Sequence, residues 1–361
     1  MPPGTSGVNG AKAPRESSES GVDSLPDGIL QHIIGFLPAR DAVRTCVLAQ
    51  RWRDLWMLAT RLRITAATDD DMEELREFVD HLFLLRGIAP LETCEMRFHS
   101  IVDADTFSSY DVVRVNLWFQ HAVRCQIRVL RFAMTGKFAY CELIATRLVS
   151  QYLMELELVG MVVKQSFLNL SGCPALELLL LDESDLRCVK KISSESLKRL
   201  SISCCFFNKS FRTHIVAPCL VSLQIDGNVN KTPVLESMPS LVNASVRIVR
   251  IDGVDVDSCN NCDSGDCDSC HSIIHGNSSC VLLEGLSKAK NLALVTESKT
   301  GSDPKMVVKG SHIPGQKTGA ISKYLEIVEV KCDVVDDKVY KVSVSSRRES
   351  KGMPLDILPL N

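Results

Sequence analysis

The first regular pattern in the chain is a set of apolar residues at helical spacing. A helix is predicted from Ser24 to Leu37, and it carries apolar side chains at i, i+1, i+4, i+5 and i+8, namely Ile29, Leu30, Ile33, Ile34 and Leu37. Ser24 and Asp27 have the spacing of a capping box, and Pro38 ends the helix. Apolar residues cover more than half of the circumference of this helix, so part of its surface needs a cover.

Two further short helices are predicted directly afterwards. One begins near Arg40 or Asp41, and the other carries Trp52, Leu55 and Trp56. Three short helices can bury only a small core of their own. A partner protein is the simplest cover for the first helix, and the alternative is a helical hairpin packed against its own chain.

The next part of the chain alternates helix and strand patterns. Residues 71–86 form an amphipathic pattern that stops at Gly87, a natural C-cap, and an alternating stretch through Cys94, Met96 and Phe98 follows. Residues 110–123 again indicate a helix, and 127–132 a strand. Two helix-then-strand units therefore lie in a row.

From residue 153 the pattern becomes L-x-x-L-x-L. Its five copies are Leu153/Leu156/Leu158, Leu176/Leu179/Leu181, Leu197/Leu200/Ile202, Leu220/Leu223/Ile225 and Leu241/Ala244/Val246. The leading residues are 23, 21, 23 and 21 positions apart, a spacing typical of leucine-rich repeats. The pattern predicts an α/β solenoid of stacked parallel strands with an irregular outer face, because the segment 182–196 has no clean apolar face. An ordinary α/β sheet is the alternative.

Length, composition and charge limit the classes of partner that this chain can bind. The chain has 361 residues, too many for one ordinary core, and 45% of them are apolar. Its 41 Lys and Arg against 44 Asp and Glu create no basic field for nucleic acid, and no apolar run reaches the ~18 residues of a membrane span. We therefore expect neither a nucleic-acid partner nor a membrane partner. The opening residues carry no secretory signal, so we expect the nucleus and/or cytoplasm, with reduced cysteines.

The opening helices resemble an F-box of the plant F-box/leucine-rich-repeat type. The residues that carry the resemblance are Leu25-Pro26-Asp27, Ile29-Leu30, Ile33-Ile34, Phe36-Leu37-Pro38, Asp41-Ala42-Val43-Arg44-Thr45, Val47-Leu48 and Arg51-Trp52-Arg53-x-Leu55-Trp56. The resemblance implies docking onto a Skp-type adaptor, and through it onto a cullin in an SCF ubiquitin ligase. It also implies the adaptor-binding residues, which are Leu25, Pro26, Ile29, Leu30, Ile33, Leu37, Val43, Val47 and Trp52.

The segment 252–280 is acidic and rich in cysteine. It holds Cys259-x-x-Cys262 and Cys267-x-x-Cys270, but only four residues separate the two pairs, where zinc sites of this kind need ten or more. We interpret the segment as a polar loop with reduced thiols and expect no metal and no cofactor. A zinc site on Cys259, Cys262, Cys267 and Cys270 stays open as the minority alternative.

Together these patterns predict a disordered tail at 1–21, an F-box at 22–62 and a leucine-rich-repeat horseshoe at 63–295 with 252–280 inserted. A polar linker at 296–321, a closing segment at 322–345 that resembles the FBD of the same plant family, and a tail at 346–361 follow. The chain shows no phosphate-binding glycine loop and no nucleophile elbow, so we expect no enzyme activity of its own. The predicted function is the substrate-recognition subunit of an SCF ligase, with the repeats holding an unknown target protein. A repeat scaffold that acts outside ubiquitin ligases is the alternative.

Overall fold

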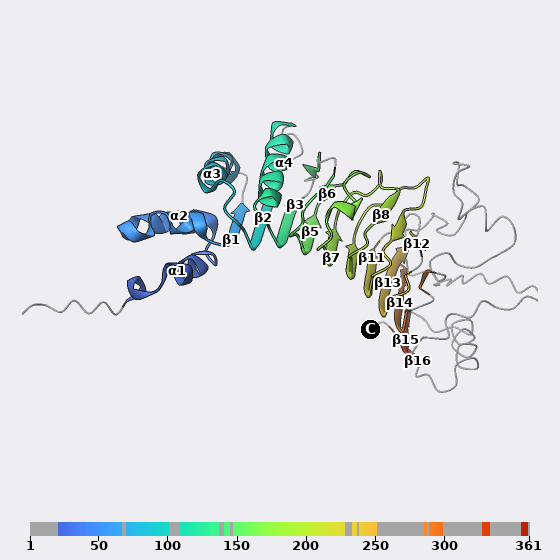
Figure 1. Cartoon of the computed structure of the whole chain (residues 1–361). Coiled ribbons are helices and arrows are strands. Elements are labelled where there is room, and N and C mark those ends of the chain that lie inside the picture. The colour runs from blue at the N-terminus through green and yellow to red at the C-terminus, as the bar shows by residue number, and fades with distance from the viewer. Residues whose placement is uncertain are drawn as a thin grey trace, which may run out of the picture.

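The computed structural model describes residues 21–66, 70–100, 109–136, 141–144, 147–227, 233–236, 238–250, 285–286, 289–298, 327–332 and 355–359. A cluster of short helices at the N-terminal end is followed by a long parallel sheet, whose strands are stacked in the order of the chain (Figure 1). The predicted solenoid is thereby confirmed.

The N-terminal cluster contains two α-helices and four 3-10 turns. They are η1 (Val22–Ser24), α1 (Asp27–Ile34), α2 (Ala39–Arg44), η2 (Thr45–Val47), η3 (Gln50–Trp52) and η4 (Leu55–Leu58). Helix α1 begins directly after Pro26 and ends before Pro38, because a proline fits the start of a helix and cannot continue its interior. The third predicted helix is two separate 3-10 turns, joined around Asp54.

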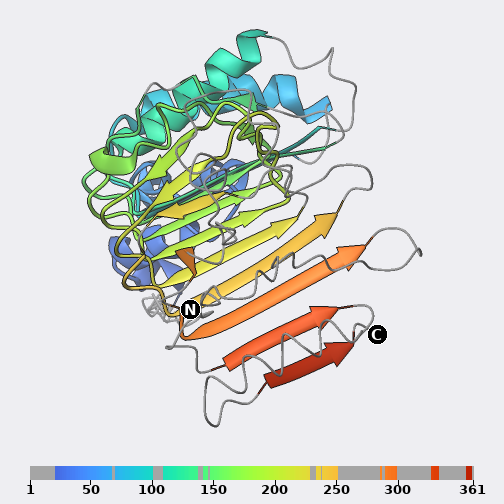
Figure 2. The ribbon, with the colours of Figure 1, turned by 90° about the vertical axis from the view of Figure 1, so that its right-hand side faces the viewer.

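The large sheet has eleven parallel strands. They are β1 (Arg61–Ala66), β2 (Thr93–Ser100), β3 (Val129–Gly136), β5 (Glu155–Val159), β7 (Leu178–Asp182), β9 (Arg199–Ser203), β11 (Ser222–Gly227), β13 (Asn243–Arg250), β14 (Asn291–Ser298), β15 (Ile327–Cys332) and β16 (Leu355–Pro359). Helices α3 (Asp70–Arg86) and α4 (Ser109–Arg124) cover one face of the first strands (Figure 2).

Beyond α4 the outer layer consists of short strands and turns. Strands β8 (Lys191–Ser193), β10 (His214–Val216) and β12 (Val234–Glu236) form a small parallel sheet, and β4 (Cys141–Glu142) pairs with β6 (Met161–Val162). The turn η6 (Leu170–Gly172) completes this layer. Among the described residues this part of the outer face contains no α-helix, as the sequence predicts, although strand β8 gives the segment 182–196 more order than its polar composition indicates.

The repeated leucines lie in register across the sheet. Leu156 of β5 faces Leu179 of β7, which faces Leu200 of β9, and the second row runs from Leu158 through Leu181 to Ile202. Both rows are buried, and on the other side of this core Phe119 of α4 lies 5.7 Å from Phe132 of β3 between ring centres. Side chains alternate along a strand, so the remaining residues of each strand lie on the sheet face turned away from α3 and α4.

The helical cluster and the repeats share one apolar core. Leu30 and Ile34 of α1 belong to the same buried cluster as Ile64 of β1 and Leu75 of α3. Arg86 at the end of α3 strengthens this junction: it is 6% exposed, and its guanidinium donates hydrogen bonds to the carbonyls of Trp56 (2.8 Å) and Ala59 (2.9 Å). Burial lowers the pKa of the Arg86 guanidinium. The first repeat therefore begins directly on the helical cluster.

The C-terminal strands extend the sheet past the predicted repeats. Strand β14 runs into the stretch predicted as a linker, β15 coincides with the strand of the predicted closing segment, and β16 lies within the stretch predicted as a tail. Residues 1–20 of the predicted N-terminal tail at 1–21, the cysteine-rich segment 252–280 and most of the linker lie outside the described residues. No helix in the described parts of the chain is long and apolar enough to cross a lipid bilayer.

Substitution Arg86→Met should destabilise the junction between the helical cluster and the first repeat. It removes both donated hydrogen bonds and leaves the buried carbonyl of Ala59 without its donor, a loss of about 1–3 kcal/mol in the free energy of unfolding. Urea unfolding followed by circular dichroism measures it. Arg124→Met, at an exposed position of α4, is the matched control and should change little. Equal midpoints for Arg86→Met and wild type would contradict this role.

Candidate functional site

The N-terminal helical cluster exposes an unusual amount of apolar side chain. On α1 and the turn after it, Ile29, Ile33 and Phe36 are 49%, 42% and 51% exposed, and beyond α2 Val47 is 82% exposed. Ile29 and Ile33 are four residues apart and so lie on one side of the helix. Large exposed apolar groups of this kind mark a surface that a partner covers. We call Ile29, Ile33, Phe36, Val47 and the neighbouring exposed Leu48 the apolar surface of the cluster.

The opposite side of α1 belongs to the core. Leu30 and Ile34 are fully buried, together with Trp52, Leu55 and Trp56 from η3 and η4. The apolar run in the sequence is therefore divided between two functions. Leu30 and Ile34 pack in the core of the cluster, and Ile29 and Ile33 remain exposed for contact with a partner.

The nine adaptor-binding residues predicted from the sequence fall into three groups. Pro26, Ile29, Ile33 and Val47 are exposed; Leu25, Leu37 and Val43 are half-buried. Leu30 and Trp52 lie in the core, where they support the surface and do not form part of it. A partner could contact those two side chains only if the cluster rearranged.

Arg51 connects the two ends of the F-box-like sequence, the Leu25-Pro26-Asp27 segment at its start and the Arg51-Trp52-Arg53 segment near its end. Its Nε donates a hydrogen bond of 2.8 Å to Oδ1 of Asp27, and its Nη2 lies 2.6 Å from the same oxygen and also donates to the carbonyl of Leu25. Both partners lie at the start of α1, where Asp27 also faces the positive end of the helix dipole. Arg51 thus holds the Leu25-Pro26-Asp27 segment against η3. The sequence motif contains both segments, but nothing in its local pattern indicates that they meet.

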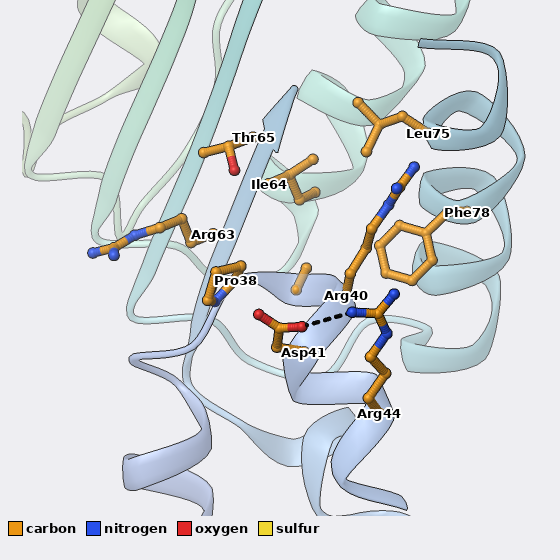
Figure 3. A pocket seen from close by; sticks show the side chains of 10 residues that line it. Pro38, Arg40, Asp41, Arg44, Arg63, Ile64, Thr65, Leu75 and Phe78 are labelled. Atoms are coloured by element: carbon orange, nitrogen blue, oxygen red, sulfur yellow. Dashed lines mark hydrogen bonds and ion pairs between the residues drawn. The ribbon is translucent and has the colours of Figure 1, made fainter. Parts of the chain in front are cut away.

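A pocket of about 250 Å³ lies between α2 and the first repeat (Figure 3). Three arginines line it, and each has a carboxylate partner: Arg40 with Glu74 at 3.9 Å, Arg44 with Asp41 at 3.1 Å and Arg63 with Glu95 at 3.3 Å. The guanidinium of Arg40 also lies over the Phe78 ring. Each arginine thus lies near a carboxylate, although Nη2 of Arg40 is buried without a hydrogen-bond partner among the described residues. The pocket marks the joint between the helical cluster and the first repeat.

Phe36 forms a second contact at this joint. The guanidinium of Arg61 lies 5.0 Å from the centre of the Phe36 ring, a cation–π geometry. Next to it, a Cβ on Gly35 would lie 3.1 Å from Cβ of Arg61, so the close approach of the end of α1 to β1 favours glycine there. The apolar surface is therefore held at a set position relative to the sheet.

Three buried thiols among the described residues are held in the protonated form. Burial raises the pKa of Cys94, Cys141 and Cys205 to about 12, so these three are protonated at neutral pH and poor nucleophiles. Among the described residues no three His, Cys, Asp or Glu side chains are grouped as metal ligands would be. The candidate ligands Cys259, Cys262, Cys267 and Cys270 lie outside the described residues.

Comparison with known proteins agrees with this arrangement. Residues 22–61 match the family described as F-box domain. The chain is 30% identical over 167 residues to an FBD-associated F-box protein of Arabidopsis thaliana, a match that covers 46% of this chain and 35% of that protein. It is 30% identical over 238 residues to an Arabidopsis F-box/FBD/LRR-repeat protein, with 57% and 51% covered.

A third relative, an F-box/LRR-repeat protein of Arabidopsis, is 27% identical over 259 residues, which is 63% of this chain and 82% of the relative. The matches to the first two relatives thus span a third to a half of their length. The helical cluster is an F-box domain, and over about half of its length the chain is distantly similar to an Arabidopsis F-box/FBD/LRR-repeat protein.

Proposed function

We propose that this chain is the substrate-recognition subunit of an SCF-type cullin ubiquitin ligase in the nucleus and/or cytoplasm. In this proposal the F-box domain binds a Skp-type adaptor, and the repeats hold a target protein. The observation that carries the proposal is the apolar surface of the F-box domain, where Ile29, Ile33 and Phe36 are about half exposed although Leu30 and Ile34 of the same segment are fully buried.

The energetics of such a surface favour a stable partner. Complete burial of an exposed Leu, Ile or Phe side chain contributes about 1.5–3 kcal/mol, and a half-exposed one contributes about half of that. Five such residues can therefore supply a large part of the binding free energy of a micromolar or tighter complex, about 8 kcal/mol or more. The Arg51 contacts add to this because they hold the start of α1 in one conformation, so less conformational freedom is lost on binding.

In this proposal the chain brings the target close to the catalytic subunits and does not itself make or break covalent bonds. A target bound to the repeats is held at a high effective concentration near the catalytic subunits, which belong to other chains of the ligase. The shared core and the Arg86 hydrogen bonds support this role, because a target on the sheet then keeps one orientation relative to the adaptor.

Substitution of Ile29 and Ile33 together by Glu should abolish binding of a Skp-type adaptor. The double variant removes two apolar contacts and places two charges where the partner is apolar, so the affinity should fall by about a hundredfold or more. Pull-down with the purified adaptor, followed by titration calorimetry, measures the loss.

The matched control is Leu84→Glu with Leu85→Glu, two exposed leucines on α3 outside the F-box domain. These changes should leave adaptor binding intact. Equal adaptor binding by the Ile29/Ile33 variant would disprove the proposed surface. A wild-type chain that binds no Skp-type adaptor would favour the alternative, a repeat scaffold outside ubiquitin ligases.

Substitution Arg51→Ala should weaken adaptor binding about fivefold. The change frees the start of α1 from η3 by removing a partly exposed ion pair and a backbone hydrogen bond, together about 1 kcal/mol. Arg51→Lys should lie between Ala and wild type, because an ammonium cannot form the forked contact. Arg53→Ala, at the next exposed arginine, is the control for calorimetric titration with the adaptor. Identical affinities for all four chains would remove Arg51 from the proposal.

A further inference from the structure

The sheet face turned away from α3 and α4 is divided into zones of different chemistry; we call it the open face. On its first strands the outward residues alternate in charge across the register. Arg63 of β1 pairs with Glu95 of β2, and Glu95 in turn faces Arg131 of β3 and Glu157 of β5 along the same row. The contacts are close: Arg63–Glu95 is 3.3 Å and Arg131–Glu157 is 3.2 Å. These charges compensate one another.

The next strand, β7, departs from this pattern. Its inward residues Leu179 and Leu181 are fully buried, and alternation places Leu178 and Leu180 on the open face, where both remain half-buried. The position in register with Leu180 is polar or charged in the three strands before β7 and in the two strands after it. It is Glu in β2, Arg in β3, Glu in β5, Ser in β9 and Gln in β11. Two leucines at these positions contribute nothing to the inner core.

Paired charges frame the two leucines. Leu178 lies in register between Glu155 of β5 and Arg199 of β9, and these two side chains meet at 3.9 Å across strand β7. An apolar centre with a rim of arginines and carboxylates is the usual composition of a protein interface. Arginines at the edge of a buried centre are also frequent among the residues that dominate binding energy.

Beyond β7 the middle row of the open face is polar and uncharged, while the rows on either side of it carry Arg199 and the ion pair of Arg247 with Asp226, at 3.7 Å. The middle row continues through Ser201 of β9, Gln224 of β11 and Ser245 of β13. None of these three side chains has a hydrogen-bond partner among the described residues. Their hydroxyl and amide groups are free to bind the backbone or the polar side chains of another molecule.

We infer that the target protein docks on the open face through an uncharged, extended segment that places an apolar side chain on Leu178 and Leu180. This inference rests on the proposed function and names the partner for its repeats. The apolar centre selects an apolar side chain, and the Ser201, Gln224 and Ser245 row binds the polar remainder of the segment. A strongly charged segment is disfavoured, since the arginines and carboxylates beside the centre are paired with one another. Asp182, which follows Leu180 on the same face, has no ion pair among the described residues and would neutralise at most a single positive charge.

A peptide selection tests the inference even though the target is unidentified. A random peptide library displayed on phage is selected on the full chain in complex with its Skp-type adaptor, and the selected peptides are then titrated against variants. The test variant is Leu178→Gln with Leu180→Gln, and the matched control is Leu84→Gln with Leu117→Gln, two exposed leucines on α3 and α4. Circular dichroism checks that each variant is folded. Ser201→Arg, which adds a charge beside Leu180, replaces the test variant if that variant unfolds.

We expect selected peptides with little net charge and at least one large apolar residue. They should bind the Leu178/Leu180 variant about tenfold or more weakly, and the control like wild type. Equal binding to test and control, a preference for strongly acidic or basic peptides, or a selection without binders would overturn the inference. So would a dimer of the wild type that the Leu178/Leu180 change dissolves, because a second copy would then occupy the leucines. Adaptor binding is measured in parallel and should be the same in all variants. If the wild-type chain does not bind the adaptor, the result counts against the proposed function and not against the proposed docking surface.

Discussion

Stacking of in-register apolar residues between parallel strands is the interaction on which this protein depends. No single repeat can bury its own inward leucines, so each relies on the strand before it and the strand after it. The row Leu156, Leu179, Leu200 shows the principle: each residue is covered by its neighbours in register. A stack of this kind needs a cover at its ends. At the N-terminal end the F-box domain supplies it, because Leu30 and Ile34 continue the same core.

This use of the F-box domain as a cover explains the division of helix α1. One side is committed to the core, and the other side, with Ile29 and Ile33, is left for a partner. The same short helix therefore links two surfaces, the inner core of the repeats and the docking surface. A change on the buried side would disturb both, and a change on the exposed side only the second. The separation is what makes the proposed adaptor contact independent of the fold.

Arginines connect the parts that apolar packing alone would leave loose. Arg51 joins the start of α1 to η3, Arg86 joins α3 to the end of the F-box domain, and Arg131 joins β3 to β5 on the open face. A guanidinium suits these positions because its several donors can hold a carboxylate and a backbone carbonyl at once. These contacts also leave little free charge on the open face, so its apolar pair Leu178 and Leu180 stands out as a feature that packing does not require.

The sequence by itself determined the elements whose signal is local or periodic. The five copies of the leucine pattern, the helix after Pro26 and the F-box resemblance all depend on residues a short, regular distance apart, and each is present in the structure or matched by the family. Tertiary structure alone decided which apolar residues face outward. Leu30 and Ile29 are neighbours with the same helical pattern, yet Leu30 is buried in the cluster that also contains Trp52 and Trp56, while Ile29 is left exposed. It also decided that residues far apart, such as Arg51 and Asp27 or Arg86 and Ala59, would meet, because the path of the chain and not its local composition brings them together.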